Sequence, residues 1–199
     1  SENASTVGSF DLGLYKTENG SNEILENLEN NKYEIVYLLG QDNLKFKKQN
    51  EFIIYQGSHG DKGAEIADII LPGAAYTEQN GYFTNLEGKL QKAYKASYPP
   101  EEAKEDWQII NELAETMNHR KLFNDKDELD SSLLNQINLF LEKDTSKETV
   151  DIDDLKFDKE ILNIDIEDYY YSNVIARASK TMFQCKNVKT NLKQTGTEG

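Results

Sequence analysis

The sequence predicts an α/β fold in which a small parallel sheet is covered by helices. The first observation is a set of three short apolar runs: Tyr33–Leu39, Phe52–Gln56 and Ile69–Leu71. Nearly continuous apolar strands are typical of a parallel sheet that is buried on both faces. The second observation is that helical patterns lie before and after these runs. Strands mixed with helices in this way favour a layered α/β architecture.

Length and charge restrict the classes of function. The chain has 199 residues, of which 36 are acidic and 22 are basic, and its formal net charge is −14. Such a chain repels phosphate backbones, so we expect no nucleic acid partner. No apolar run approaches the roughly 20 residues that a membrane-spanning helix needs, so we expect no direct membrane span.

Cysteine and histidine usage gives no sign of a metal site. The single cysteine, Cys185, cannot form an internal disulfide and cannot by itself hold an iron–sulfur cluster, which usually takes about four thiolates. His59 and His119 have no metal-ligand spacing around them. Cys185 is expected to be a small buried apolar residue at the end of an amphipathic helix.

The N-terminal part is expected to contain a loop, a short helix and then the first strand. Residues 1–20 are polar and contain glycine, which predicts a loop or connector. A helix is predicted over Ser21–Asn31, because Ile24, Leu25 and Leu28 share one helical face. Ser21 is a suitable N-cap for this helix.

Two longer helices are predicted after the strands. Pro100 suits the first position of a helix, and Glu101 and Glu102 complement the positive end of its dipole. Apolar residues then recur at spacings of three and four, which indicates one buried stripe: Ala103, Trp107, Ile110, Ala114 and Met117. Trp107 is interpreted as a core residue. A second helix is predicted over Lys126–Lys143, with an apolar face formed by Leu129, Leu133, Ile137, Phe140 and Leu141.

The composition changes at Asp144 and divides the chain into two regions. Residues 1–143 are predicted to form the α/β domain. Residues 144–199 are predicted to form an acidic extended arm, a helix after Ser172 and a polar, frayed tail from Thr190 to Gly199. In the terminal helix, Val174, Ala178, Met182 and Cys185 lie roughly in line.

The loops after the strands are where an open α/β sheet binds ligands. These loops read "GQDN", "QGSHGDKG" and "PGAAYTEQNG". The glycines Gly57, Gly60 and Gly63 fit neither the dinucleotide fingerprint nor the P-loop. Such a loop can offer backbone N–H groups to an anion, but we favour a tight turn that needs positive φ.

Two carboxylate-containing pairs lie in these loops, and a structural role is favoured for both. His59 and Asp61 could act as an acid–base pair, yet no nucleophile motif such as G-x-S-x-G accompanies them. A histidine that bonds its own backbone is the simpler interpretation. Glu78 and Glu87 are expected to accept backbone N–H bonds and hold the long loop in shape. Composition and spacing alone therefore indicate an acidic α/β domain without an evident active site.

The stretch from Ala67 to Gln91 resembles the molybdopterin oxidoreductase superfamily. The recurring pattern of that family is Ala-Asp, an apolar strand, Leu-Pro, Glu, Gly and then Asn-x-Glu-Gly-Arg-x-Gln. Here it reads Ala67-Asp68, Ile69–Leu71, Pro72, Glu78, Gly81, Asn85, Glu87, Gly88, Lys89 and Gln91, with Lys89 where arginine is usual.

The resemblance is closer to one branch, the large iron–sulfur subunits of respiratory NADH:ubiquinone oxidoreductase (complex I). The runs that carry it are "IIYQGSHGDKGAEIADIILPGAAYTE", "EDWQIINELAE" and "DYYYSNVIARASKTMFQC". It covers nearly the whole chain and is weakest between Lys121 and Lys159. It implies a partial three-layer α/β domain of the molybdopterin-oxidoreductase type.

The resemblance also implies a structural role. In that branch the iron–sulfur clusters lie in an N-terminal region that this chain lacks, and the C-terminal region is not known for a bound pterin. We therefore expect no catalytic residue, metal ligand or cofactor on this chain. The remains of the pterin loops would be Gly57, Gly60, Gly63, Asn85, Glu87, Gly88 and Gln91.

The implied partners are a separate chain that carries the N-terminal iron–sulfur portion and other peripheral-arm subunits of complex I, on the matrix side of the mitochondrial inner membrane. A cleaved fragment is the alternative to a split subunit. Three parallel strands leave unpaired edges, so the chain alone is expected to be poorly soluble or partly unfolded. The alternative function is the C-terminal piece of a true molybdopterin enzyme of the formate dehydrogenase or nitrate reductase type, in which the loops contact the pterin.

Overall fold

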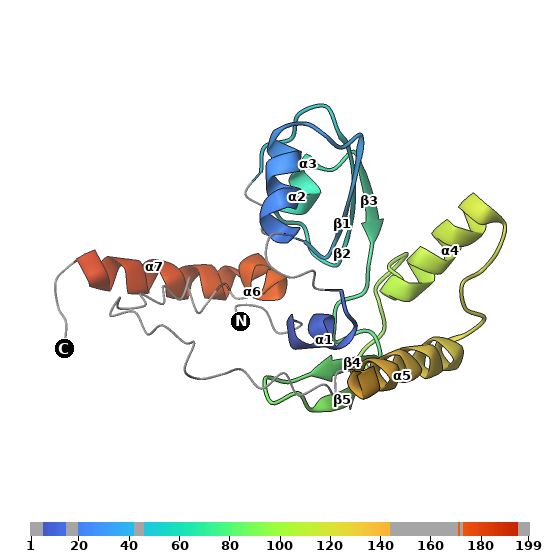
Figure 1. Cartoon of the computed structure of the whole chain (residues 1–199). Helices are drawn as coiled ribbons and strands as arrows, with labels where there is room; N and C mark the ends of the chain where they lie inside the picture. The colour runs from blue at the N-terminus through green and yellow to red at the C-terminus, as the bar shows by residue number, and fades with distance from the viewer. Residues whose placement is uncertain (1–5, 15–19, 42–45, 144–170, 172, 195–199) are drawn as a thin grey trace, which may run out of the picture.

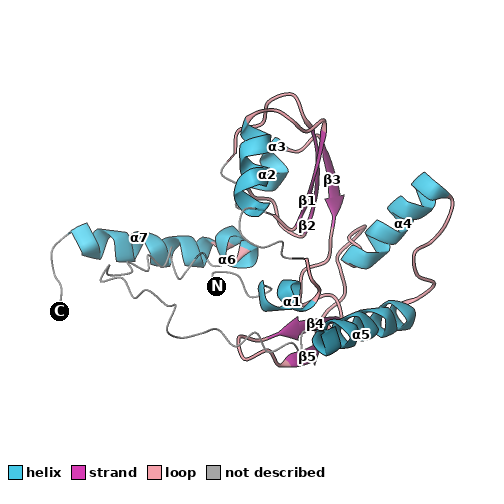
Figure 2. Ribbon diagram, in the orientation of Figure 1, coloured by secondary structure: helices cyan, strands magenta, loops and turns pink. Residues whose placement is uncertain are grey.

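A computed structural model describes residues 6–14, 20–41, 46–143, 171 and 173–194, and its elements are drawn in Figure 1 and, coloured by type, in Figure 2. The predicted acidic arm lies outside these residues. In chain order the elements are α1 (Thr6–Asp11), α2 (Gly20–Glu29), β1 (Ile35–Leu39), β2 (Phe52–Gly57), α3 (Lys62–Ile66), β3 (Ile69–Pro72), β4 (Gly81–Thr84), β5 (Leu90–Ala93), α4 (Asp106–Asn118), α5 (Lys126–Lys143), α6 (Val174–Ala178) and α7 (Lys180–Gln194).

The main sheet is the predicted parallel one, with strand order β1-β2-β3. Tyr55 in the central strand is opposite Leu38 of β1 and Ile70 of β3. The buried core cluster contains Leu38, Ile53 and Tyr55. Helix α3 packs against it through Ala64 and Ile66. The three apolar runs of the sequence are therefore confirmed as a parallel sheet in an α/β arrangement.

The sequence predicted strands that are buried on both faces of the sheet. Among the described residues this is correct for β2 and wrong for its neighbours β1 and β3. Ile53 is fully buried, whereas Ile69 and Ile70 of β3 are 45% and 53% exposed. Adjacent strand residues point to opposite faces, so both faces of β3 are uncovered. Ile35 and Leu39 at the ends of β1 are also exposed. A third layer over this sheet is not visible in the described part of the chain.

Four short elements lie where the sequence predicted loops. Helix α1 falls inside residues 1–20, and helix α3 falls inside the glycine loop, with Asp61 as its N-cap. Strands β4 and β5 pair antiparallel inside the predicted long polar loop. Each element has only four to six residues, which is too short for an apolar period to stand out. Helix α2 also begins at Gly20, so Ser21 lies within the helix and is not its cap.

Helix α4 begins at Asp106 and not at Pro100. The segment before it is tied to the end of β3, because Lys104 N donates to Pro72 O and Ala74 N donates to Lys104 O. Backbone groups committed to this bridge cannot enter a helix. The predicted stripe shifts accordingly: Ala103 lies outside the helix and Met117 is 70% exposed, while Ile109, Asn111 and Ala114 are the buried residues of α4.

The last two predicted helices are present, and the terminal one is divided into α6 and α7. Helix α5 has the predicted bounds. The terminal helix is interrupted at Ser179, whose extended backbone ends α6 and whose Oγ accepts a hydrogen bond from Met182 N in the first turn of α7. Helix α7 continues to Gln194, so residues 190–194 are helical and not part of a tail as predicted, and the last residues of the predicted tail lie outside the described part of the chain. Cys185 is only partly buried.

The β4–β5 hairpin is joined to α5 by a buried carboxylate. Asp130 is 6% exposed, and its two oxygens lie 3.1 Å from Lys92 Nζ of β5 and 3.1 Å from Lys126 Nζ. Burial by itself raises the pKa of Asp130, but contacts with the two lysines outweigh burial and leave its pKa below the ordinary value of 3.8. The ionised carboxylate therefore holds the hairpin against the helix.

We predict that Asp130→Ala destabilises the fold by about 1–3 kcal/mol, because two lysines lose a buried acceptor. Glu112→Ala, which removes the exposed ion pair with Lys104, should change stability by less than about 1 kcal/mol. Because the pKa of Asp130 is depressed in the folded state, its stabilisation is present above the unfolded pKa and is lost as pH falls through the folded pKa. Protease resistance of the chain at several pH values measures both effects, and equal acid sensitivity of wild type and Asp130→Ala would contradict this role.

Candidate functional site

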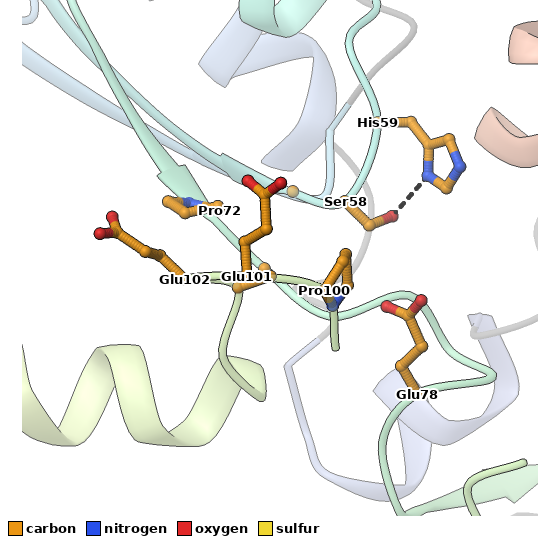
Figure 3. Close-up of a pocket in the computed structure, with 10 residues that line it drawn as sticks. Ser58, His59, Pro72, Glu78, Pro100, Glu101 and Glu102 are labelled. Atoms are coloured by element: carbon orange, nitrogen blue, oxygen red, sulfur yellow. Dashed lines mark hydrogen bonds between the residues drawn. The ribbon is translucent and has the colours of Figure 1, made fainter. Parts of the chain in front are cut away.

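A hollow among the described residues lies at the carboxyl ends of β2 and β3. It is an open pocket of about 620 Å³. Its lining comes from the end of β2, the end of β3, the following loop and the segment before α4: Gly57, Ser58, His59, Pro72, Gly73, Glu78, Pro100, Glu101, Glu102 and Ala103. Figure 3 shows the three glutamates around this hollow. The lining thus carries three carboxylates and neither lysine nor arginine.

The glycine loop is shaped around the ring of Tyr55. The Tyr55 side chain is 1% exposed, and its hydroxyl donates to His59 O at 3.0 Å. A Cβ at Gly57 would overlap the Tyr55 hydroxyl, and one at Gly63 would lie 2.8 Å from its ring. Neither glycine has positive φ, so the predicted reason for them was wrong. They are required because a side chain there would collide with Tyr55.

Gly60 differs from its two neighbours in the loop. A Cβ built there meets nothing within 4 Å, and the residue is exposed. The packing of the chain therefore gives no reason for a glycine at this position.

His59 and Asp61 do not form an acid–base pair. His59 Nδ1 lies 3.0 Å from Ser58 Oγ, so its partner is the neighbouring side chain and not its own backbone. Figure 3 shows the His59 ring beside Ser58, with the hydrogen bond between them dashed. Asp61 caps α3 through Lys62 N at 2.8 Å and forms a salt bridge with Arg177 of α6. Both carboxylate oxygens of Asp61 are therefore used to hold helices in place.

The second predicted loop, Asn85–Gln91, is a hairpin turn that lies outside the pocket. Asn85 Oδ1 accepts from Glu87 N at 3.0 Å and from Lys89 N at 2.9 Å. Gly88 has φ of 77°, so its glycine serves the turn. Gln91 lies in β5 opposite Phe83. The structure therefore does not bring these residues to Gly57, Gly60 and Gly63.

The two glutamates of the long loop have separate partners. Glu78 Oε2 accepts from Ala75 N at 2.9 Å, which is the structural role expected from the sequence. Glu87 is exposed and its Oε2 contacts Asn85 Nδ2 at 3.5 Å. They do not form a carboxylate pair.

A polar network beneath the pocket was not predicted from the sequence. Gln56 is fully buried, and its Nε2 donates to Asp106 Oδ1 at 2.7 Å. Its Oε1 accepts from the Tyr37 hydroxyl. Gln79 Nε2 donates to Asp106 Oδ2 at 3.2 Å. The only sequence signal is a glutamine that continues an apolar strand, and nothing in the sequence pairs it with a residue fifty positions later.

The network explains the electrostatics of Tyr37. Burial, and then the negative charge of Asp106, raise the pKa of Tyr37 above its ordinary value. The phenol therefore stays protonated and remains a donor to Gln56. The Asp106 carboxylate is thus surrounded by neutral hydrogen-bond donors. Among these described residues there is no nucleophile paired with a general base.

A metal centre and a membrane span are both lacking in the part of the chain that the structure describes. No group of three or more His, Cys, Asp or Glu side chains there is placed to hold a metal ion. None of the helices in the described ranges combines the length and the apolar character needed to span a membrane.

Comparison with protein families gives two matches. Residues 1–116 match the model of molybdopterin oxidoreductase. Residues 138–185 match the model of a C-terminal region that belongs to a subunit of NADH-ubiquinone oxidoreductase. The glycine loop, the hairpin and the start of α4 fall in the first match, and α6 with the first part of α7 falls in the second.

Several curated relatives carry related names. The chain is 37% identical over 93% of its length to the NADH-ubiquinone oxidoreductase 75 kDa subunit of Reclinomonas americana. It is 40% identical over 97% to a subunit of the NADH-quinone oxidoreductase of Rickettsia bellii. It is 35% identical over 92% to the mitochondrial NADH-ubiquinone oxidoreductase 78 kDa subunit of Candida albicans. The chain spans 26–28% of the length of these relatives.

We predict that Gly57→Ala and Gly63→Ala each destabilise the chain by about 1–3 kcal/mol, because the added methyl group collides with the Tyr55 ring. Gly60→Ala is the matched control in the same loop and should be neutral. Protease resistance of the chain after heating measures all three. A Gly60→Ala variant that loses a bound small molecule or a function while keeping its stability would show that the loop holds a ligand.

Proposed function

This chain belongs to the molybdopterin oxidoreductase family, and from that premise we propose that it is a structural, C-terminal portion of the large iron–sulfur subunit of proton-pumping NADH:ubiquinone oxidoreductase. In this role it braces the peripheral arm that carries electrons from NADH to quinone. It holds no cofactor, and the iron–sulfur clusters lie on the portion that corresponds to the rest of its relatives. The name of the Candida albicans relative supports a mitochondrial location, and we place the chain on the matrix side of the inner membrane as part of this proposal.

The charge of the pocket is the observation that carries this proposal. A pterin cofactor bears a phosphate and needs donors or positive charge around it. The pocket is instead lined by Glu78, Glu101 and Glu102, without lysine or arginine. Like charges this close disfavour an anion, so the residues present do not fit the cofactor that the family name suggests. A true molybdopterin enzyme is the alternative, and the pocket charge argues against it.

Both candidate loops have structural tasks that support the same proposal. Gly57 and Gly63 make room for Tyr55, and Asn85 closes a hairpin turn. Two of the three loop glycines and the Asn85 side chain thus serve the packing and turns of the chain itself. This supports a fold that keeps the family's architecture without its ligand.

The open edge of the sheet supports a partner. Strand β3 pairs with β2 on one side only among the described residues, and Ile69 and Ile70 are exposed on it. An exposed apolar edge strand is a site of association. We propose that the portion corresponding to the rest of the large subunit, on a separate chain in a split subunit, covers this edge beside other peripheral-arm subunits.

The first test is purification of the chain from its native membranes in mild detergent, followed by a native gel with an NADH-dehydrogenase stain. Mass spectrometry of the stained band should find this chain beside a cluster-binding polypeptide, and its peptides also show whether the two are separate chains. Molybdenum analysis of the same band should find none. A small molybdenum-containing complex without NADH activity would establish the alternative.

We predict that His59→Ala leaves NADH-dependent quinone reduction by the assembled complex unchanged, because the His59 ring is paired with the neighbouring Ser58, and the Tyr55 hydroxyl contacts His59 through its backbone oxygen, which the substitution keeps. Turnover is measured per assembled complex on solubilised membranes. A loss of more than about tenfold, which corresponds to about 1.4 kcal/mol of transition-state stabilisation, would contradict a purely structural role.

A substitution at the sheet edge, unlike one at His59, should impair assembly of the complex. We predict that Ile70→Lys lowers the amount of assembled complex without changing turnover per complex, because a charge on an edge strand blocks strand and apolar contacts. Leu86→Lys is the control, since Leu86 is 80% exposed in the hairpin turn. Equal loss in both variants would mean that the edge is not the docking surface.

A further inference from the structure

The Asp106 carboxylate lies where a ligand of an open α/β sheet is expected. Such ligands bind outside the carboxyl ends of the strands. Gln56 is the penultimate residue of β2 and holds Asp106 Oδ1 at 2.7 Å. Gly73 directly follows β3, and a Cβ at that position would lie 2.8 Å from the same oxygen. The carboxylate therefore sits over the ends of two neighbouring parallel strands.

The surroundings of this carboxylate are those of an anion site. Both oxygens receive amide donors, from Gln56 and from Gln79. Asp106 is the first residue of the 13-residue helix α4, where the helix dipole favours negative charge. Gly73 is buried, and its lack of a side chain lets the carboxylate approach the backbone. The donors come from the sheet and from the loop between β3 and β4.

We propose that Asp106 is the resident anion of an oxyanion site at the carboxyl edge of the sheet, so that the chain supplies its own ligand there. Without this carboxylate, the site would accept a small carboxylate or another oxyanion of similar size. The inference rests on the proposed function, because a chain that binds no cofactor still needs an acceptor for these donors. The inference adds the identity of that acceptor, which is the Asp106 carboxylate.

The proposal explains why Gln56 tolerates burial. Gln56 is completely buried, and a buried amide without an acceptor costs free energy. Asp106→Ala removes the shorter of the two acceptors of each amide and opens a space of about the size of the carboxylate. Gln56 Nε2 keeps the contact with the backbone oxygen of residue 106 at 3.3 Å, and Gln79 Nε2 keeps the contact with Ala74 O at 3.4 Å. A formate ion has the same two oxygens and fits that chemistry.

The test is rescue of Asp106→Ala by formate, with the full chain in its native assembly. The folded fraction is measured as protease-resistant chain after heating, in sodium formate and in sodium chloride of equal ionic strength. At a formate concentration about ten times its dissociation constant, the folded-to-unfolded ratio of the variant should rise about elevenfold. Wild type should not respond, because its site is filled.

Two controls separate the site from general effects. Glu112→Ala removes an exposed carboxylate from the same helix and should gain nothing specific from formate. Asp106→Asn removes the charge but keeps the space filled, so it should be destabilised and not rescued. An equal effect of formate on all variants would overturn the proposal. The absence of any effect of formate on an Asp106→Ala variant that remains folded would overturn it as well.

A double-mutant cycle with Gly73 covers the case in which Asp106→Ala does not accumulate. Gly73→Ala should destabilise wild type, because its methyl group displaces the carboxylate. The same change should be nearly neutral in Asp106→Ala or in the milder Asp106→Ser, where the space is free. Additive effects would overturn the proposal. Molybdenum in the wild-type assembly would contradict the proposed function, whereas additivity or absent rescue contradicts this inference alone.

Discussion

The hydrogen bond between Gln56 and Asp106 joins the sheet to the helical part of the molecule. It links the end of the central strand to the first residue of α4 at 2.7 Å. The bridge between Gly73 and Lys104 lies beside it and fixes the same junction through the backbone. The position of α4 relative to the sheet, and the shape of the pocket between them, follow from these contacts.

Two successive residues of β2 organise the two faces of the sheet. Tyr55 and Gln56 are both almost completely buried and, as neighbours on a strand, point to opposite faces. The tyrosine ring packs beneath the glycine loop and α3, where it excludes side chains at Gly57 and Gly63. The glutamine faces the polar network and α4. Around β2, one face of the sheet is therefore covered by apolar packing, and the other is covered by the hydrogen-bonded network of Gln56 and Asp106.

The Asp106 carboxylate accepts hydrogen bonds from the amide donors near the strand ends, and three glutamates line the neighbouring hollow. The edge strand β3 shows the reverse situation, because its apolar residues have no cover among the described residues. This distribution of carboxylates and exposed apolar residues supports the proposal that the chain is a structural portion of a larger assembly.

The sequence by itself determined the parallel sheet, the bounds of α5 and the family, because buried strands and an 18-residue helix carry strong local patterns. It also placed Glu78 in a structural role. Only the tertiary structure decided where α4 begins, since the bridge at Lys104 overrides the favourable Pro100 start. It alone showed why Gly57 is glycine and that Asp106 fills the site. Both depend on contacts between segments far apart in the chain, which local propensity does not encode.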